Sequence, residues 1–554
     1  MVRSFTYVLL ILIACMIVPG YLLAGAQEND VLPPSVMPVV ILEGSDYDMG
    51  YQYGQQAGQY IEKRVVIEWG TYARNGWSRD EVISELKACQ YYIKMYAPEQ
   101  IEMMQGIADG ATDAGYNVSY TDVLLLNSTW AVRRQPPTAT YPPAEDEDVD
   151  QNCSNFAAWG SSTKDGSLVF GGTADESNVD YVIVVVAFPD EGNAFITTCR
   201  PGELSQGPMM NNKGVIYSVG TGPTLRDVDK DYGIPWPNAR QHLIRYANSA
   251  QDVVDMLLEM QVSAGLNLTI ADTSGNAFVA EVTADQKAIR VPGDHGESDF
   301  IYATNNFFTE EMKAPTKGEE YGFIEHVGWA RGNSVPRNKL LWNMLDHYKG
   351  NVDIEFVKMI LRFPSDTPLS PPWAGWDRFV ADKGNYRVNA WIPDDGDAGL
   401  CYICTGSAGR PVYPPFEYGD SGRVMTGPTH TFYELRLADR PEAVAGYANA
   451  TAKTEVCRAV QLFETLNFTD TAYTVLNNLL NQAISDYYKG YIALNEGSII
   501  GSGNEALFTF GKATSLFARA QAHALQVSEF FVPPATSPED LGLEPWGTWE
   551  DFLE

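Results

Sequence analysis

The spacing of apolar residues changes period along the chain, and the changes divide it into segments. From residue 27 to 135, an opening strand, VMPVVILEG, precedes stretches in which apolar residues recur at helical spacing. From Cys153 the period becomes two, in runs such as SLVFGGT, DYVIVVVAFP, VIYSVG and AFVAEV. After about residue 440 the helical period returns. Strands flanked by helices predict an α+β layered sandwich rather than a doubly wound sheet.

The first helical stretch, YDMGYQYGQQAGQYIEKRV, carries Gly50, Gly54 and Gly58 at every fourth position. This spacing places the glycines on one helical face. Glycine lowers helix stability unless another backbone packs closely there, so we expect a tight helix–helix contact along this face. Further helices are predicted in RDEVISELKACQYYIKMYA, PEQIEMMQGIADGATDAG, SAQDVVDMLLEMQVS, RNKLLWNMLDHY and VDIEFVKMILRF. Of these, SAQDVVDMLLEMQVS is the one helix expected among the strands.

The N-terminus has the pattern of an export signal. Arg3 precedes an apolar run from Tyr7 to Leu23, and Ala24-Gly25-Ala26 forms an A-x-A cleavage site, so residues 1–26 are predicted to be removed. The alternative is an uncleaved membrane anchor, because the run approaches the roughly 18 apolar residues that span a bilayer. We expect a secreted or extracytoplasmic protein. Glycosylation sequons start at Asn117, Asn127, Asn267, Asn449 and Asn467.

Composition excludes some functions. The formal net charge of −33 argues against nucleic-acid binding, which needs a basic face. No two of the six histidines have metal-ligand spacing, and we expect no metal and no cofactor. Cys401 and Cys404 have the spacing of a metal or redox pair, but LCYIC predicts a buried strand. Without the signal, six cysteines remain, enough for three disulfides unless Cys153 stays free.

The dipeptide Asn152-Cys153 carries the main chemical prediction. A Pro-rich and then acidic stretch, residues 136–151, precedes it and is typical of a disordered spacer, while strand, turn and strand follow it. A thiol is nucleophilic only as the thiolate and needs a base. An α-amine titrates near ~8, so cleavage before Cys153 would supply a base on the same residue. The pattern predicts self-cleavage between Asn152 and Cys153; the alternative for Cys153 is a buried core residue or half of a disulfide.

Spaced motifs after Cys153 carry a family resemblance. Cys153, Asp165-Gly166, Gly171 and Asp175 resemble the hairpin of N-terminal-nucleophile hydrolases, especially the autoproteolytic penicillin acyltransferase-like family, related to choloylglycine hydrolases. Matches continue in order over roughly residues 47 to 405: the upstream glycine helix, MNNKG, VIYSVGTG, LTIADTSGNAFVAEV, ATNNF around Asn305, and the S-x-x-R from Ser334 to Arg337.

The resemblance implies a four-layer αββα sandwich and a division of the chain. It implies a helical prosegment or small subunit at 27–152 with a linker at 136–152, and a catalytic core at 153–439. The helical period after the core predicts a helical C-terminal region at 440–554.

The resemblance also implies residue roles. Cys153 would be nucleophile and, through its amine, general base, and Asp175 would orient the amine. Asn305 would donate its amide to the developing oxyanion. Arg337 would anchor the site by pairing with a carboxylate, supported by Ser334.

Each role has an ordinary structural alternative. Asp175 and Asn305 would be turn residues, and Arg337 a surface charge at a helix start. Thr221 stands where the bile-salt branch has Asn, and would donate through its hydroxyl or its backbone.

These inferences together predict an exported cysteine amidohydrolase or acyltransferase that acts on a small acylated molecule. Its own cleaved prosegment would be its partner, and a membrane only if the N-terminal segment is retained. One alternative is a phospholipase B-like lipid hydrolase. The other is a non-enzymatic binding protein on a degenerate hydrolase scaffold, which Gly172 and Thr173 favour because relatives usually have Arg or Gln, then Asn, at these positions.

Overall fold

A computed structural model describes most of the chain between residues 37 and 544. The predicted export signal, the acidic linker and Asn152 lie outside the described residues, and residues 34–554 form one compact unit. The described ranges are 37–129, 131–132, 153–175, 182–221, 232–263, 265–284, 286–312, 334–362, 385–394, 399–405, 416–418, 423–425, 431–466, 473–535 and 537–544.

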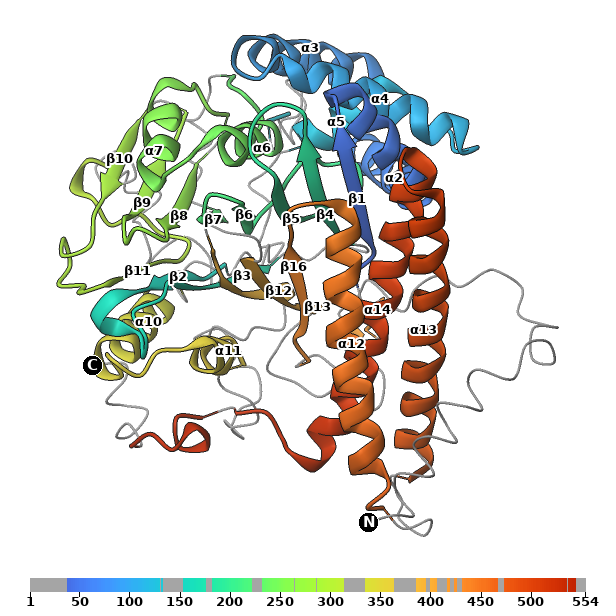
Figure 1. The fold of residues 1–554 in the computed structure, drawn as a ribbon. Helices are drawn as coiled ribbons and strands as arrows, with labels where there is room; N and C mark the ends of the chain where they lie inside the picture. Colours follow the sequence, from blue (N-terminus) through green and yellow to red (C-terminus); the bar gives the residue numbers. More distant parts are fainter. Residues whose placement is uncertain are drawn as a thin grey trace. The chain divides into compact units, whose positions relative to one another are not determined.

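The segment before Cys153 folds as predicted into one strand and a set of helices (Figure 1). The sequence analysis missed the last of them, α5, because its apolar run, VLLL, is too short to show a helical period. A capping box between Ser119 and Asp122 starts this helix. The elements are β1 (Val39–Gly44), α2 (Asp46–Arg74), α3 (Arg79–Tyr96), α4 (Glu99–Asp113) and α5 (Tyr120–Ser128).

The glycine face of α2 packs against α4, as the spacing predicted. A Cβ atom at Gly50 would lie 2.0 Å from the carbonyl oxygen of Met103, and one at Gly54 would lie 2.2 Å from that of Ile107. Side chains at these two positions would therefore force the helices apart.

The first sheet has eight strands, in the order β1-β4-β5-β6-β7-β8-β9-β10. β1 is parallel to β4, with Val39 opposite Val184, and the other neighbours are antiparallel. The segment before Cys153 therefore contributes a strand to a sheet that the later segment builds. The strands after β1 are β4 (Ile183–Pro189), β5 (Phe195–Cys199), β6 (Met209–Asn211), β7 (Val215–Thr221), β8 (Leu266–Asp272), β9 (Ala277–Val282) and β10 (Lys287–Arg290).

The second sheet has six antiparallel strands, in the order β11-β2-β3-β12-β13-β16. Cys153 lies two residues before β2. Its strands are β2 (Asn155–Ala158), β3 (Val169–Asp175), β11 (Phe300–Ala303), β12 (Asn385–Ile392), β13 (Gly399–Thr405) and β16 (Tyr433–Leu437), and a small separate sheet pairs β14 (Phe416–Tyr418) with β15 (Arg423–Met425).

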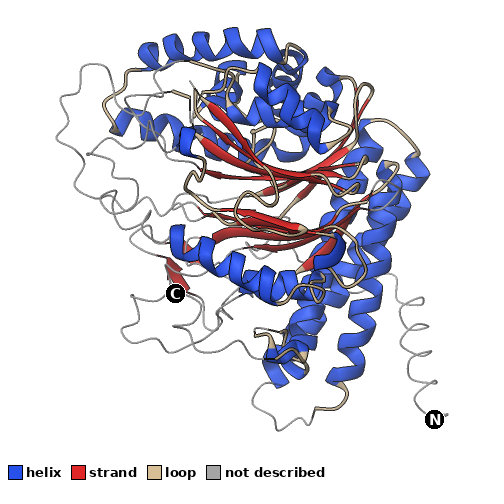
Figure 2. Cartoon of the chain, turned by 90° about the vertical axis from the view of Figure 1, so that its left-hand side faces the viewer, coloured by secondary structure: helices blue, strands red, loops and turns tan. Residues whose placement is uncertain are grey.

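The two large sheets stack face to face, with helices on their outer faces (Figure 2). Phe170, Trp391 and Ile216 belong to the apolar core between the sheets. The outer face of the first sheet packs on α2 to α5 and on α6 (Trp236–Tyr246) and α7 (Ala250–Glu259), and that of the second on α10 (Ser334–His347) and α11 (Ile354–Arg362). The mixed α+β prediction is confirmed, but α6 corrects the expectation of one helix among the strands.

The C-terminal helices lie along one edge of the stacked sheets. α14 (Asn504–Phe531) contacts the edge strands β1 and β16, and it packs on α12 (Pro441–Phe463) and α13 (Tyr473–Ile500). The hydroxyl of Ser515 on α14 accepts a hydrogen bond from the backbone N–H of Val39, at 2.8 Å. These helices therefore cover the unpaired edge of β1.

The six described cysteines form no disulfide with one another. Cys401 packs between the two sheets. Cys404, three residues further along β13, packs on the other face of the strand, in the apolar core formed with α10 and α11. Residues on opposite faces of a strand cannot share a metal ion or a disulfide. The expectation of a buried strand there is confirmed. In the part of the chain that the structure describes, no group of three or more His, Cys, Asp or Glu residues is arranged to hold a metal.

Two predicted glycosylation sites are inaccessible in the fold. The side-chain nitrogen of Asn127 donates to Gly202, and that of Asn267 donates to Thr304, and both residues are 1% exposed. Asn117 is exposed, whereas Asn467 lies outside the described residues.

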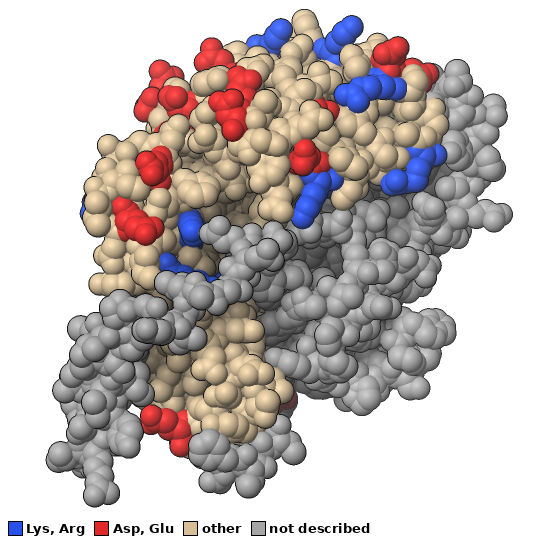
Figure 3. Space-filling model, turned by 90° about the vertical axis from the view of Figure 1, so that its right-hand side faces the viewer, with Lys and Arg blue, Asp and Glu red and all other residues tan. Residues whose placement is uncertain are grey.

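On the face drawn in Figure 3, acidic and basic side chains are interspersed over the described surface. None of the helices described is long and apolar enough to cross a bilayer.

Candidate active site

Cys153 lies at the entrance to β2 and is only 6% exposed. The next residue extends the ladder between β2 and β3, because the Ser154 N–H donates to the Thr173 hydroxyl and the Thr173 N–H donates to the Ser154 carbonyl, both at 2.9 Å. Thr173 therefore has a structural function that the sequence did not reveal: it fixes the backbone next to the predicted nucleophile.

Arg337 approaches this backbone from α10. Its Nη1 donates to the carbonyl oxygen of Cys153 at 2.6 Å and to the hydroxyl of Ser154 at 2.8 Å. Its Nη2 donates to Oδ1 of Asn305 at 2.8 Å. The side chain is completely buried, which contradicts the alternative of a surface charge. These three partners are neutral oxygens, and the carboxylate pairing that the resemblance implied stays a prediction.

Asn305 follows β11 and is linked to Cys153 through Arg337. Ala303, the last residue of β11, pairs with Asn155 on β2, and Arg337 bonds both the Asn305 amide and the Cys153 carbonyl. A guanidinium can only donate, so the atom that faces Arg337 must be the amide oxygen. The amide nitrogen of Asn305 therefore points away from Arg337, which leaves the orientation of this donor fixed. The segment is held further by Asn267, which donates to the carbonyls of Thr304 and Asn306.

The other three predicted site residues are placed only through their backbones. Asp175 ends β3 opposite Asn385, Thr221 ends β7, and Ser334 begins α10. Their side chains lie outside the described part of the structure, so their roles stay predictions.

Three buried thiols in the described part of the chain are poor nucleophile candidates. Burial raises the pKa of Cys89 to about 12 and raises the pKa values of Cys401 and Cys404 well above their usual range. These thiols therefore remain protonated at neutral pH. They belong to the packed cores.

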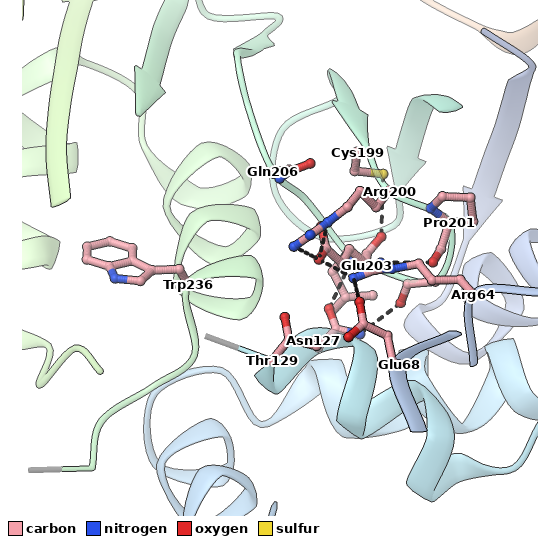
Figure 4. Close-up of polar contacts among 12 residues, drawn as sticks. Arg64, Glu68, Asn127, Thr129, Cys199, Arg200, Pro201, Glu203, Gln206 and Trp236 are labelled. Carbon is pink, nitrogen blue, oxygen red and sulfur yellow. Dashed lines mark hydrogen bonds and ion pairs between the residues drawn. The ribbon is translucent and has the colours of Figure 1, made fainter. Parts of the chain in front are cut away.

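A buried ionic cluster ties the segment before Cys153 to the segment after it (Figure 4). Oε1 of Glu203, which follows β5, accepts from Nη2 of Arg64 on α2 at 2.8 Å and from Nη2 of Arg200 at 2.7 Å. Burial alone would raise the pKa of Glu203, but the two guanidiniums lower it by more, so the carboxylate stays charged. The same loop is held by Asn127, which donates to Gly202 and accepts from the Leu204 N–H.

Replacement of Arg337 by Lys is expected to slow turnover more than it weakens substrate binding. A lysine keeps the charge but cannot bond the Cys153 carbonyl, Ser154 and Asn305 through one planar fork. Loss of charged hydrogen bonds worth about 1.5–3 kcal/mol predicts a 10- to 100-fold lower kcat. Steady-state kinetics test this, with Lys339→Ala, an exposed position on the same helix, as control. An unchanged kcat with a higher KM would contradict the positioning role.

Comparison with known proteins agrees with the motifs. Residues 162–321 match the family described as acyl-coenzyme A:6-aminopenicillanic acid acyl-transferase. An uncharacterized protein of Archaeoglobus fulgidus is 26% identical over 364 residues, which cover 60% of this chain and 58% of that protein.

Two solved structures are similar to this chain over most of their own length. A mutant of the conjugated bile acid hydrolase from Clostridium perfringens has a TM-score of 0.30 at 14% identity, covering 46% of this chain and 89% of that one. Penicillin V acylase from Agrobacterium tumefaciens has a TM-score of 0.30 at 12% identity, covering 52% and 91%. The family match itself rests on residues 162–321, which are similar to the acyl-coenzyme A:6-aminopenicillanic acid acyl-transferase family, as the motifs predicted.

Proposed function

We propose that this protein is an exported, self-processing cysteine amidohydrolase or acyltransferase of the N-terminal-nucleophile kind. One observation carries the proposal: Arg337 joins the backbone of Cys153 to the side chain of Asn305. These three residues come from separate segments of the chain, and the motifs had named each of them. The stacked sheets between helical layers support the αββα architecture that such enzymes have.

The first reaction is the activation of the precursor. The Cys153 sulfur attacks the Asn152 carbonyl carbon, the C–N bond breaks, and the proton of the thiol passes to the departing nitrogen. Water then hydrolyses the resulting thioester, which leaves a carboxylate on Asn152 and a free amine on Cys153. The new amine supplies the base that the thiol lacks in the precursor.

The second reaction is turnover. The Cys153 amine accepts the thiol proton, the thiolate attacks the carbonyl carbon of an amide, and the amide nitrogen leaves with that proton. The side-chain nitrogen of Asn305, oriented by Arg337, stabilises the developing oxyanion. Water or an amine then takes the acyl group from the sulfur.

After cleavage, we expect the two chains to stay together. The N-terminal chain contributes β1 to the first sheet, and its Arg64 is buried against Glu203. Separation would expose a sheet edge and leave a buried charge unpaired. Native size-exclusion chromatography should give one peak that denaturing electrophoresis resolves into chains of about 14 and about 44 kDa, scaled by length from 61.2 kDa. A large chain that elutes alone would contradict this.

Sequencing of the large chain from its N-terminus tests the proposal directly, since it should begin Cys153-Ser154-Asn155. Hydrolysis of acyl-amides in preference to phospholipids by the purified protein would separate an amidase from the phospholipase B-like alternative. Labelling of Cys153 by a thiol-reactive acylating probe would exclude the non-enzymatic binding protein. An intact chain that turns over substrate at full rate would end the proposal.

A further inference from the structure

The inner face of the six-stranded sheet changes from apolar to polar toward Cys153. Side chains alternate along β2: Phe156 packs with the outer core of α10 and α11, while Ala157 packs between the sheets. Asn155 therefore faces the space between the sheets. On β12, Val388 packs outward and Trp391 packs between the sheets, so Asn389 faces the same space.

The two asparagines form one row across three strands. Asn155 pairs with Gly172 on one side, and Asn389 pairs with Gly172 on the other. Directly paired residues point to the same face. The row lies two residues from Cys153 along β2, a distance of roughly 7 Å at the usual rise per residue. The next row, Ala157, Phe170 and Trp391, is apolar.

Both asparagines are fully buried and unsatisfied. In the part of the chain that the structure describes, neither the amide nitrogen nor the amide oxygen of Asn155 or Asn389 has a hydrogen-bond partner. Each such group costs about 1–3 kcal/mol, and at least about 90% of buried polar groups in proteins are paired. By contrast, the buried amide nitrogens of Asn127 and Asn211 each make two hydrogen bonds. An apolar residue would stabilise the fold better at positions 155 and 389.

The opposite sheet continues the polar zone. Ser218 and Thr269 pair in register on β7 and β8, and they share the inner face with Ile216 and Ala271. Gly172 lets the two sheets approach closely at this point: a Cβ there would lie 2.7 Å from Oδ1 of Asn155 and 3.2 Å from Oγ of Ser218.

We propose that Asn155 and Asn389 form a subsite for a neutral hydrogen-bonding group, such as a carboxamide, on the acyl part of the substrate. The subsite rests on the proposed function, because its distance from Cys153 matches an acyl chain held at that sulfur. Two carboxamides offer both donors and acceptors, so they complement a group that carries both. The substrate class is therefore an acyl-amide whose acyl chain carries a polar, uncharged group a few bonds from the scissile carbonyl.

Two p-nitroanilides of equal shape test the subsite. In 4-carbamoylbutanoyl anilide the acyl chain ends in a carboxamide, and in 5-methylhexanoyl anilide an isopropyl group takes its place. We expect the mature protein to show at least a tenfold higher kcat/KM for the carboxamide, since a polar site rejects an apolar isostere. Equal values, or a preference for the isopropyl chain, would overturn the subsite.

Substitution separates the subsite from general structural effects. Asn389→Leu and Asn155→Ala should each abolish the carboxamide preference, and Asn389→Leu should fold at least as stably as wild type. The matched control is Asn193→Leu, which removes a buried amide that donates to Ala247 away from the row. The control should lose stability and keep the preference. A preference that survives in both row variants would overturn the proposal.

Binding distinguishes failure of the subsite from failure of the proposed function. Calorimetry with wild-type protein should show tighter binding of 4-carbamoylbutanoate than of 5-methylhexanoate. If this preference is found but neither anilide is cleaved, the subsite stands and the proposed amidase activity is wrong. If binding shows no preference, the subsite is wrong whether or not the anilides are cleaved.

Discussion

Replacement of Cys153 by Ala is expected to leave a single uncut chain without amidase activity. The substitution removes the sulfur that would attack Asn152 in the precursor and the substrate in the mature enzyme, so both reactions fail together. Removal of a nucleophile that acts with its base lowers kcat by about 10⁴-fold or more. The fold should persist, because Cys153 loses only its sulfur while its carbonyl keeps the bond from Arg337. Intact-mass measurement and an acyl-amide assay provide the two readings.

The control for this variant is Cys457→Ala, which removes an exposed thiol on α12. It should be cut and should turn over substrate like wild type. A Cys153→Ala chain that is still cut between residues 152 and 153 would show that another group or another protease makes the break. Full amide hydrolysis by that variant would remove Cys153 from the mechanism altogether.

Replacement of Glu203 by Gln is expected to cause the largest loss of stability. The new side chain would keep the shape of the glutamate but leave Arg64 and Arg200 buried beside a neutral group. Removal of one partner from a buried ion pair costs about 3–5 kcal/mol. Urea unfolding of both proteins in a Cys153→Ala background, where the chain stays single, should show a lower midpoint for the Glu203→Gln variant. Glu68→Gln is the matched control, because Glu68 lies 3.5 Å from the same Arg64 at a more exposed position. Its cost should stay below about 1 kcal/mol.

The pH dependence gives an independent reading of this carboxylate. The pKa of Glu203 is lowered in the folded protein. Its contribution to the free energy of unfolding is therefore complete above its pKa in the unfolded chain, about 4.3. The contribution is lost as the pH falls through the folded pKa. The stability difference between wild type and Glu203→Gln should therefore persist at neutral pH and narrow in acid below about pH 4. A difference that does not change over this range would show that the lost stability is not electrostatic.

The sequence predicted what depends on local period and on spaced motifs. The glycine spacing in α2 predicted its contact with α4. The order of the motifs predicted Cys153, Asn305 and Arg337 as site residues, and the fold brings them together. Elements without a period were missed: the apolar run of α5 is only four residues long, and β6 has only three residues. The function of Thr173 and the row of Asn155 and Asn389 depend on which strands pair. Pairing between distant strands cannot be deduced from the residues of one strand. A polar residue inside an apolar strand, as in VNAW, was the available signal for Asn389.

The position of β1 has a consequence for the life of the mature protein. This strand lies between β4 and α14, elements that follow it by well over a hundred and by several hundred residues. While the polypeptide is continuous, its assembly is a unimolecular event. If the backbone is cut before Cys153, as proposed, recovery from denaturation requires two separate molecules to meet and therefore depends on their concentration. The active enzyme would then be held in its native form mainly by slow unfolding, and heat damage that the precursor can repair would become permanent.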